Sequence, residues 1–214
     1  MRQIESIDPN NPDPGLLARA GEMLRKGLLV AYPTETFYGL GALPRNVAAI
    51  ELIYEAKGRP EKLALPLVLG DENVVMLCVR EFPVGAQRLG EAFWPGPLTL
   101  VLPAADDLPP RLLGGRHSVG IRISPHKVAT GLARAAGGPI IATSANRSGR
   151  PAPSSAEEVQ EALGDSVALI LDGGETTGGA ASTVLDLTIS PPRVVRRGAI
   201  PMTDIERILG HRLT

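Results

Sequence analysis

Apolar runs and amphipathic segments alternate along the chain. The run LLVAY at 28–32 is typical of a buried strand, and the preceding GLLARAGEMLRK carries apolar residues at helical spacing. Asp13 and Pro14 suit the N-cap and first position of that helix, and Gly27 can end it. The first third of the chain therefore begins with a helix that leads into a buried strand.

The same alternation continues to the C-terminus. Helices are expected over 47–57 after an Asn46 cap, over 84–93, over 126–136 opened by Ser124 and Pro125, from about 155, and near 203–209 with Thr203 and Glu206 at its start. Strands are expected in LPLVLG, LTLVLP, SVGIRI, PIIAT, VALILDGG, STVLDL and RVVRRG. No Ser- or Pro-rich linker divides these elements. We predict a single α/β domain over 1–214 on a mixed sheet, in which AADDLPPRLLGGRH at 104–117 is the mobile loop.

Composition narrows the class of protein. Of 214 residues 43% are hydrophobic and 21% charged, and the net charge is −1, so no global attraction draws the chain to nucleic acid. Cys78 lies among apolar neighbours, where a buried structural role is favoured over a nucleophile, and a lone cysteine fits a reducing compartment. The N-terminus lacks a signal peptide and no stretch reaches the length of a membrane span, which predicts a cytoplasmic protein.

Unusual polar residues follow several strands, at the place where ligands bind in open α/β sheets. In YPTETFYGLGA at 32–42, Thr34 and Thr36 offer hydroxyls, and Gly39 and Gly41 allow close backbone approach. An ordinary strand, turn and strand with Glu35 in solvent explains this segment equally well.

Two further segments suggest anion and polar-ligand binding. Lys57, Arg59 and Lys62 could grip a triphosphate, or could instead be cations favoured by the end of a helix. In ATSANRSGRPAPSS at 142–155, Ser144 and Asn146 supply neutral donors and acceptors, and Ser154 and Ser155 lie where a helix N-terminus can bind an anion or simply be capped.

A fourth segment and several absences complete the residue-level interpretation. Ser182 and Thr183 start one strand, and Arg196 and Arg197 in another point to opposite faces, so at most one of the two arginines enters a given pocket. The sequence contains neither a P-loop nor a GxGxxG motif, and His117, His126 and His211 do not have the spacing of metal ligands. Binding and charge neutralisation are therefore favoured over covalent catalysis.

Six motifs together resemble one family. YPTETFYGLG, AKGRP, FWPGPLTLVL, VGIRI, ATSANRSGRPAPSS and STVLDL with VVRRGAI occur in the order and approximate spacing of the YrdC-like threonylcarbamoyl-AMP synthases, over residues 14 to 201. The resemblance implies an enzyme, a nucleotidyltransferase, that joins L-threonine, bicarbonate and ATP into threonylcarbamoyl-AMP and releases pyrophosphate. It further implies a twisted, open mixed sheet with flanking helices around a large cationic cavity. The product would be used by separate transferase machinery that modifies tRNA beside the anticodon, with weak tRNA binding as a possible addition.

The resemblance also assigns roles to residues. It implies that Lys57 and Arg59 are catalytic and hold the ATP phosphates, with Mg²⁺ carried mainly by those phosphates. The remaining expected contacts are Thr34, Arg122, Ser144 and Ser182 for threonine, and Ser118, Asn146, Ser154 and Arg196 for ATP. Glu35 has no assigned role.

Two departures from the family and two alternatives remain open. The family often reads R-I-P-x-H-P where this chain reads RISPHK. Longer members of the family add a C-terminal domain, and this chain resembles the short form, in which 104–117 or the N-terminal segment is expected to close the site. A carbamoyl-AMP-dependent carbamoyl transferase and an RNA-binding module are the alternatives. The near-neutral charge and 3% aromatic content count against the RNA-binding module.

Overall fold

The strands divide between two mixed sheets. The computed structural model describes residues 3–60 and 62–213. Sheet A contains, in spatial order, β1 (Gln3–Ser6), β9 (Leu169–Asp172), β2 (Val30–Tyr32), β3 (Gly39–Gly41) and β8 (Thr143–Ser144). Sheet B contains β11 (Arg193–Arg196), β10 (Thr183–Asp186), β5 (Leu98–Pro103), β6 (Ser118–Ile123), β4 (Leu67–Leu69) and β7 (Ile140–Ile141). The expected α/β class with mixed parallel and antiparallel pairing is confirmed, in two sheets instead of one.

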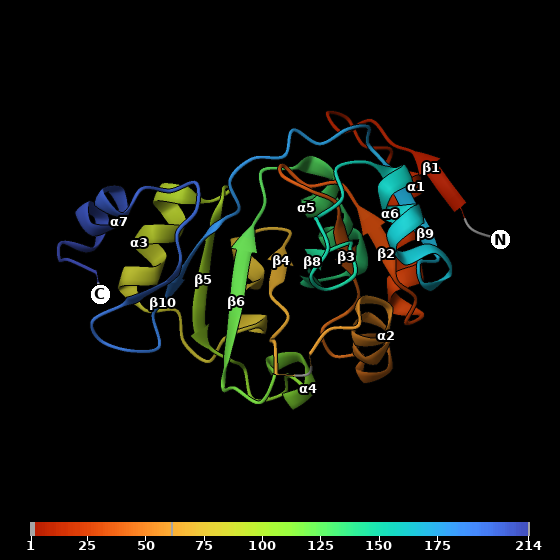
Figure 1. Cartoon of the computed structure of the whole chain (residues 1–214). Coiled ribbons are helices and arrows are strands. Elements are labelled where there is room, and N and C mark those ends of the chain that lie inside the picture. The colour runs from red at the N-terminus through yellow and green to blue at the C-terminus, as the bar shows by residue number, and fades with distance from the viewer. Residues whose placement is uncertain (1–2, 61, 214) are drawn as a thin grey trace.

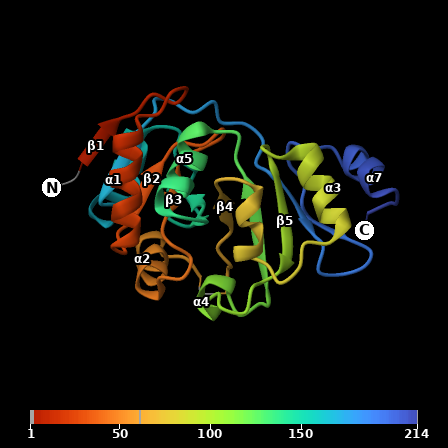
Figure 2. The same ribbon diagram turned by 180° about the vertical axis from the view of Figure 1, so that it is seen from behind.

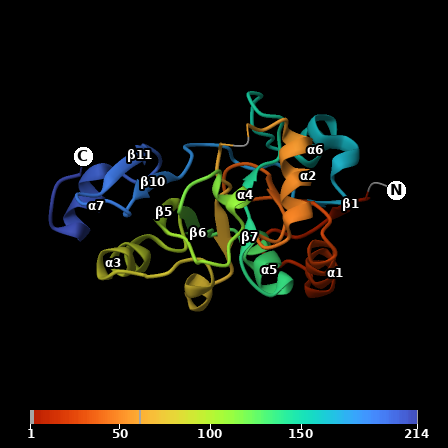
Figure 3. The same ribbon diagram turned by 90° about the horizontal axis from the view of Figure 1, so that it is seen from below.

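Helices cover both faces of sheet A. The helices α1 (Pro14–Arg25) and α5 (Lys127–Ala136) lie on one face, and α2 (Val47–Lys57) and α6 (Ala156–Leu163) on the other (Figure 3). In β2, Val30 and Tyr32 pack with α1 and α5, whereas Ala31 packs with the opposite cluster. Burial on both faces explains why this strand reads as an uninterrupted apolar run in the sequence.

Sheet B is covered by helices on one face along β5, whereas its opposite face is covered at β4 and β7, where Val68 and Ile140 pack with α5. Leu98, Leu100 and Leu102 of β5 point into the main core together with residues of α3 (Val84–Phe93). Figures 1 and 2 show α3 on one side of this sheet and the helix α7 (Met202–Leu209) beside it, near the C-terminus, while the N-terminus lies at the far end of sheet A. The uncovered part of that opposite face therefore turns toward the middle of the molecule.

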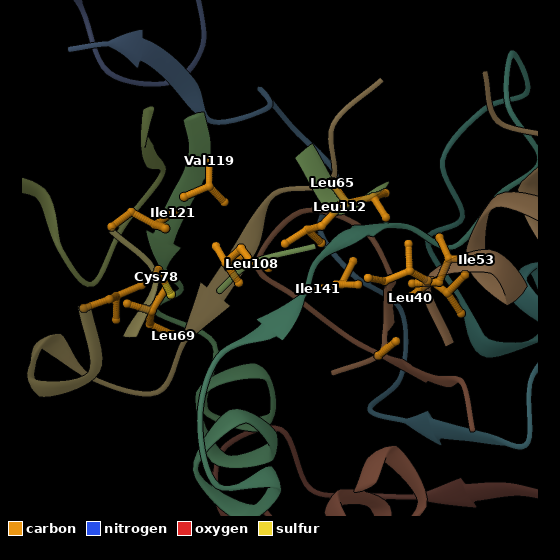
Figure 4. Close-up of a cluster of buried hydrophobic side chains, with 14 of the residues drawn as sticks. Leu40, Ile53, Leu65, Leu69, Cys78, Leu108, Leu112, Val119, Ile121 and Ile141 are labelled. Atoms are coloured by element: carbon orange, nitrogen blue, oxygen red, sulfur yellow. The ribbon is translucent and has the colours of Figure 1, made fainter. Parts of the chain in front are cut away.

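The core runs continuously between the two sheets, as the cluster in Figure 4 shows. Cys78 is fully buried in this cluster, and burial raises the pKa of its thiol to about 12. The prediction that Cys78 is a small buried hydrophobe is confirmed. Among the helices of the described residues, none has both the length and the apolar character needed to cross a membrane.

The helix starts follow the capping signals in most places. Asp13 accepts from the Leu16 amide at 2.7 Å and Asn46 from the Ala49 amide at 3.0 Å, as expected. The expected start of α5 at Ser124 is wrong, because the Ser124 hydroxyl bonds Glu35 and His126 caps the helix instead. The cap of α7 is Pro201, one residue before the helix.

The segment 104–117 differs from the expected mobile loop. It contains the short helix α4 (Pro110–Leu113), and Leu108, Leu112 and Leu113 are buried in the core. The Leu65 amide also donates to the Leu112 carbonyl at 2.9 Å. Because three leucines anchor this segment, it cannot move as a free lid. The sequence interpretation also missed β1 and two 3-10 helices, η1 (Glu72–Leu77) and η2 (Gly164–Ser166).

Candidate active site

A cavity of about 450 Å³ lies between the two sheets. Residues of β3 and β8 line it from sheet A, and residues of β4, β5, β6, β10 and β11 line it from sheet B. A volume of roughly 300–1,000 Å³ is usual for small-molecule sites. The uncovered part of this face of sheet B therefore forms one wall of a pocket that can hold a ligand of ordinary metabolite size.

The alternation of β6 directs its polar residues into this cavity. Ser118 and Arg122 line it, whereas Val119 and Ile121 belong to the core on the opposite face. Gly120, between the two polar residues, also lines the cavity, and a Cβ there would lie only 3.2 Å from the Thr99 side chain. A single strand thus supplies a hydroxyl and a guanidinium to the pocket and leaves room between them.

Four guanidinium groups line the cavity, those of Arg59, Arg116, Arg122 and Arg196, and no Asp or Glu is among the lining residues that the structure describes. Burial lowers the pKa of Arg59, Arg122 and Arg196, and the proximity of Arg196 lowers that of Arg122 further. Concentrated positive charge with reduced hydration favours an anionic ligand.

Arg122 is paired with Glu35. Its Nη1 donates to Glu35 Oε1, and the two side chains are 13% and 19% exposed. The other carboxylate oxygen, Oε2, accepts from the Ser124 hydroxyl at 2.6 Å. The residue that sequence reasoning left without a role thus holds the guanidinium at the end of β6.

A second network joins the strands at the opposite wall. Arg196 donates from Nε to the Ser182 carbonyl at 3.0 Å and from Nη2 to the Ser182 hydroxyl at 2.9 Å. That hydroxyl lies 2.9 Å from Thr99 Oγ1. All three residues line the cavity and Arg197 does not, which agrees with the expected opposite faces of the two arginines.

Lys57 lies behind the cavity wall. Its Nζ donates to the Ser144 carbonyl, to the Asn146 carbonyl at 2.8 Å and to Asn146 Oδ1 at 3.3 Å, and the residue is 2% exposed. Burial lowers its pKa to about 8, and Arg59 contributes to the same shift. The ammonium group therefore fixes the backbone of the loop that presents Ser144.

The PTET turn is held by its own hydroxyl. Thr34 Oγ1 donates to the Phe37 carbonyl at 2.6 Å and accepts from the Phe37 amide at 3.3 Å. A Cβ on Gly39 or Gly41 would come within 3.0 or 2.9 Å of the Tyr32 ring. The expected close backbone approach at both glycines is confirmed, and it brings Thr34 to the cavity edge.

Most of the sequence-predicted site residues meet at this cavity. Those among its lining are Thr34, Arg59, Ser118, Arg122, Ser144, Ser182 and Arg196. Lys57, Asn146 and Ser154 are not. The amide and hydroxyl of Ser154 contact Glu158 Oε2 at 2.6 and 3.2 Å, and Ser155 caps α6 by accepting from the Glu158 amide at 3.2 Å. Ser154 therefore belongs to the N-terminus of α6 in this structure.

Sequence reasoning missed Arg116 and Thr99, which also line the cavity. Arg116 had a usable signal, since the two-residue alternation of 118, 120 and 122 extends back to 116. Thr99 had a weaker one, an isolated polar residue inside an apolar strand. In both cases the alternation along the strand is the feature that predicts the place of the residue in the cavity lining.

Metal binding by the protein itself finds no support in the donor set. Within residues 3–60 and 62–213, no three His, Cys, Asp or Glu side chains gather where they could hold a metal ion. The described cavity lining offers hydroxyls and carbonyls but no carboxylate, the ligand that Mg²⁺ usually takes from a protein. The residues do not fit a protein-held Mg²⁺.

The chain thus combines a mixed α/β fold with a cavity lined by four arginines and several serine and threonine side chains. A family model, Sua5_yciO_yrdC, described as "Telomere recombination", matches residues 22–198. The chain belongs to this family.

Three known proteins show how far the similarity extends. Threonylcarbamoyl-AMP synthase of Pyrococcus abyssi is 43% identical over 191 residues, which are 89% of this chain and 56% of that protein. The Bacillus subtilis protein of the same name is 42% identical over 207 residues, 96% of this chain and 59% of that protein. The crystal structure of P. abyssi Sua5 complexed with L-threonine superposes with a TM-score of 0.92 at 39% identity, covering all of this chain and 62% of that one. This chain thus spans less than two thirds of the length of these relatives.

Proposed function

We propose that the protein is an L-threonylcarbamoyladenylate synthase. It condenses L-threonine, bicarbonate and ATP into threonylcarbamoyl-AMP and pyrophosphate, and a separate transferase then uses the product to modify tRNA. The observation that carries the proposal is the cavity between the sheets, where four arginines meet serine and threonine hydroxyls. Relatives named for this activity and a similar structure complexed with L-threonine support the same assignment.

The threonine subsite is proposed near the end of β6. Arg122 supplies a buried guanidinium for the carboxylate of the amino acid, because a guanidinium can bind a carboxylate through two parallel hydrogen bonds. Thr34, Ser144 and Ser182 line the same cavity and offer groups for the amine and hydroxyl. Charge and hydroxyls in this combination suit a small polar amino acid.

The nucleotide subsite is proposed along the remaining wall. Arg59, Arg196 and Ser118 line the cavity, and in this proposal the two arginines contact the phosphates and Ser118 hydrogen-bonds the nucleotide. Lys57 and Asn146 act here through the loop that they hold, unless ATP binding draws the ammonium from its carbonyl partners. Ser154 would contact the nucleotide only if its bonds to Glu158 rearranged.

The proposed chemistry requires no protein nucleophile. The neutral amine nitrogen of threonine attacks the carbon of bicarbonate, and loss of water gives a carbamate. An oxygen of the carbamate then attacks the α-phosphorus of ATP, and pyrophosphate leaves. The barrier is the approach of two anions and the charge on the transferring group, and the guanidiniums of Arg59 and Arg196 neutralise both. Mg²⁺, when present, would arrive on the phosphates and screen their charge.

The proposal is tested by pyrophosphate release from ATP, Mg²⁺, bicarbonate and L-threonine. Release should require L-threonine, and the adenylate product should carry one threonine and one carbonyl carbon by mass spectrometry. Release without threonine that depends on carbamoyl phosphate would favour a carbamoyl transferase. Absence of release together with tight, salt-sensitive RNA binding would favour the RNA-binding alternative.

A further inference from the structure

The carboxylate of Glu35 sits against Arg122 without lining the cavity. Arg122 is among the lining residues and Glu35 is not. In the part of the chain that the structure describes, Glu35 is the one hydrogen-bond partner of the Arg122 side chain, and only Nη1 is engaged. The remaining N–H groups of Arg122 are therefore left for a ligand that enters the cavity.

Glu35 itself is held at two points besides its contact with Arg122. Its Oε2 accepts from the Ser124 hydroxyl at 2.6 Å, and that hydroxyl oxygen also accepts from the His126 amide at 3.1 Å. The backbone carbonyl of Glu35 accepts from the Thr177 hydroxyl at 3.2 Å. Ser124 is 1% exposed, so its contact with the carboxylate is largely shielded from solvent. A carboxylate fixed in this way can set the orientation of the guanidinium that it contacts.

We propose that Glu35 is a positioning residue for substrate recognition. It locks the Arg122 guanidinium so that its free edge faces the cavity and binds the carboxylate of the amino-acid substrate, and Ser124 supports it from behind. The inference rests on the proposed function, since it concerns how that substrate is selected.

The opposite role, a carboxylate that competes with the substrate for Arg122, makes the reverse prediction. A competitor must leave the guanidinium when the substrate binds, so its removal would strengthen binding. Glu35 contacts Arg122 from outside the cavity lining and is tied to Ser124, so the substrate has no need to displace it. Positioning predicts that removal of the carboxylate weakens binding.

The test compares Glu35→Gln with the wild-type protein by calorimetric binding of L-threonine and of L-threoninol, which lacks the carboxylate. We expect L-threonine binding to weaken by about tenfold, as for loss of one charged hydrogen bond. Binding of L-threoninol and of ATP should change by less than about twofold, because neither uses the substrate-carboxylate contact. A role in general stability would instead weaken all three ligands.

Two further variants complete the experiment. Ser124→Ala should weaken L-threonine binding in the same direction but less, and the double variant should be no worse than Glu35→Gln, because both act through Arg122. Glu81→Gln removes an exposed carboxylate and serves as the matched control. If Glu35→Gln does not fold, Ser124→Ala decides the question alone.

The outcomes separate the inference from the proposed function. Unchanged or tighter L-threonine binding by Glu35→Gln, or by Ser124→Ala where only that variant folds, overturns the positioning role while wild-type turnover still supports the synthase. A wild-type protein that neither binds L-threonine nor releases pyrophosphate with it overturns the proposed function itself.

Discussion

Replacement of Lys57 by methionine separates a structural from a functional effect. Methionine keeps an unbranched apolar stem and removes the ammonium group that holds the loop at Ser144 and Asn146. Because the ammonium is buried, two opposing terms act on the free energy of unfolding. Their sizes can be estimated from the structure.

The two terms partly offset each other. Burial lowers the Lys57 pKa from 10.5 to about 8, which corresponds to a destabilisation of about 3 kcal/mol at pH 7 that methionine removes. Between pH 8 and 10.5 the unfolded chain binds the Lys57 proton more tightly than the folded protein does. The free energy of unfolding contributed by Lys57 therefore rises with pH in this range. Two buried carbonyls, those of Ser144 and Asn146, lose their cationic donor, at a cost of about 1–3 kcal/mol each. The net change in unfolding free energy is therefore expected within about 3 kcal/mol of zero.

Turnover should fall even where the two stability terms offset each other. Without its ammonium anchor the loop no longer presents Ser144 and Asn146 in fixed positions, and a displacement near 1 Å can cost about 100-fold in rate. Urea unfolding at pH 7 and threonine-dependent pyrophosphate release measure the two quantities. Lys26→Met, which removes an exposed lysine paired with Glu22, is the control and should leave both nearly unchanged. A folded Lys57→Met protein with wild-type turnover would refute the role of Lys57.

Three further predictions follow from single contacts. The kcat/KM for ATP should fall as pH rises through about 8, because Lys57 loses its proton there. In Lys57→Arg the fall should move to higher pH, and pH profiles of kcat/KM for both proteins measure the difference. Gly41→Ala should lower the thermal midpoint, because its Cβ would lie 2.9 Å from the buried Tyr32 ring. Gly174→Ala serves as a comparison, since its Cβ would meet no atom within 4 Å and its φ of +80° leaves backbone strain as the cause of any change in the midpoint. Ser155→Ala should destabilise by about 1 kcal/mol through loss of the α6 cap, as measured by urea unfolding, and an unchanged midpoint would contradict that capping role.

Local signals predicted the elements of this fold well. Helix α2 begins after the Asn46 cap and ends at Gly58, which has a left-handed backbone conformation, as the sequence indicated. Both capping interactions act within one turn of the helix, so the local sequence contains them. The start of α5 was mispredicted for the opposite reason. Ser124 has the sequence of a cap, but its hydroxyl bonds a carboxylate 89 residues away, and no local pattern contains that partner.

The site was predictable by residue type and less so by contact. Five of the predicted site residues in the cavity lining were identified in the polar segments, namely Thr34, Arg59, Ser144, Ser182 and Arg196. Two more, Ser118 and Arg122, were identified only through the family resemblance. The partners of those residues depend on how sheet A packs against sheet B. Arg122 and Glu35 are 87 residues apart, as are Lys57 and Ser144, so their pairing follows only from the assembled sheets.

The arrangement of sheet B explains how a chain of net charge −1 presents a cationic pocket. Period-two alternation places leucine, valine and isoleucine of β5 and β6 in the core and turns Thr99, Ser118 and Arg122 toward the cavity. Among the described residues, the carboxylate that contacts Arg122 is that of Glu35, which is not part of the cavity lining. The cationic character of the cavity thus follows from where its arginines lie, and the overall charge of the protein does not predict it.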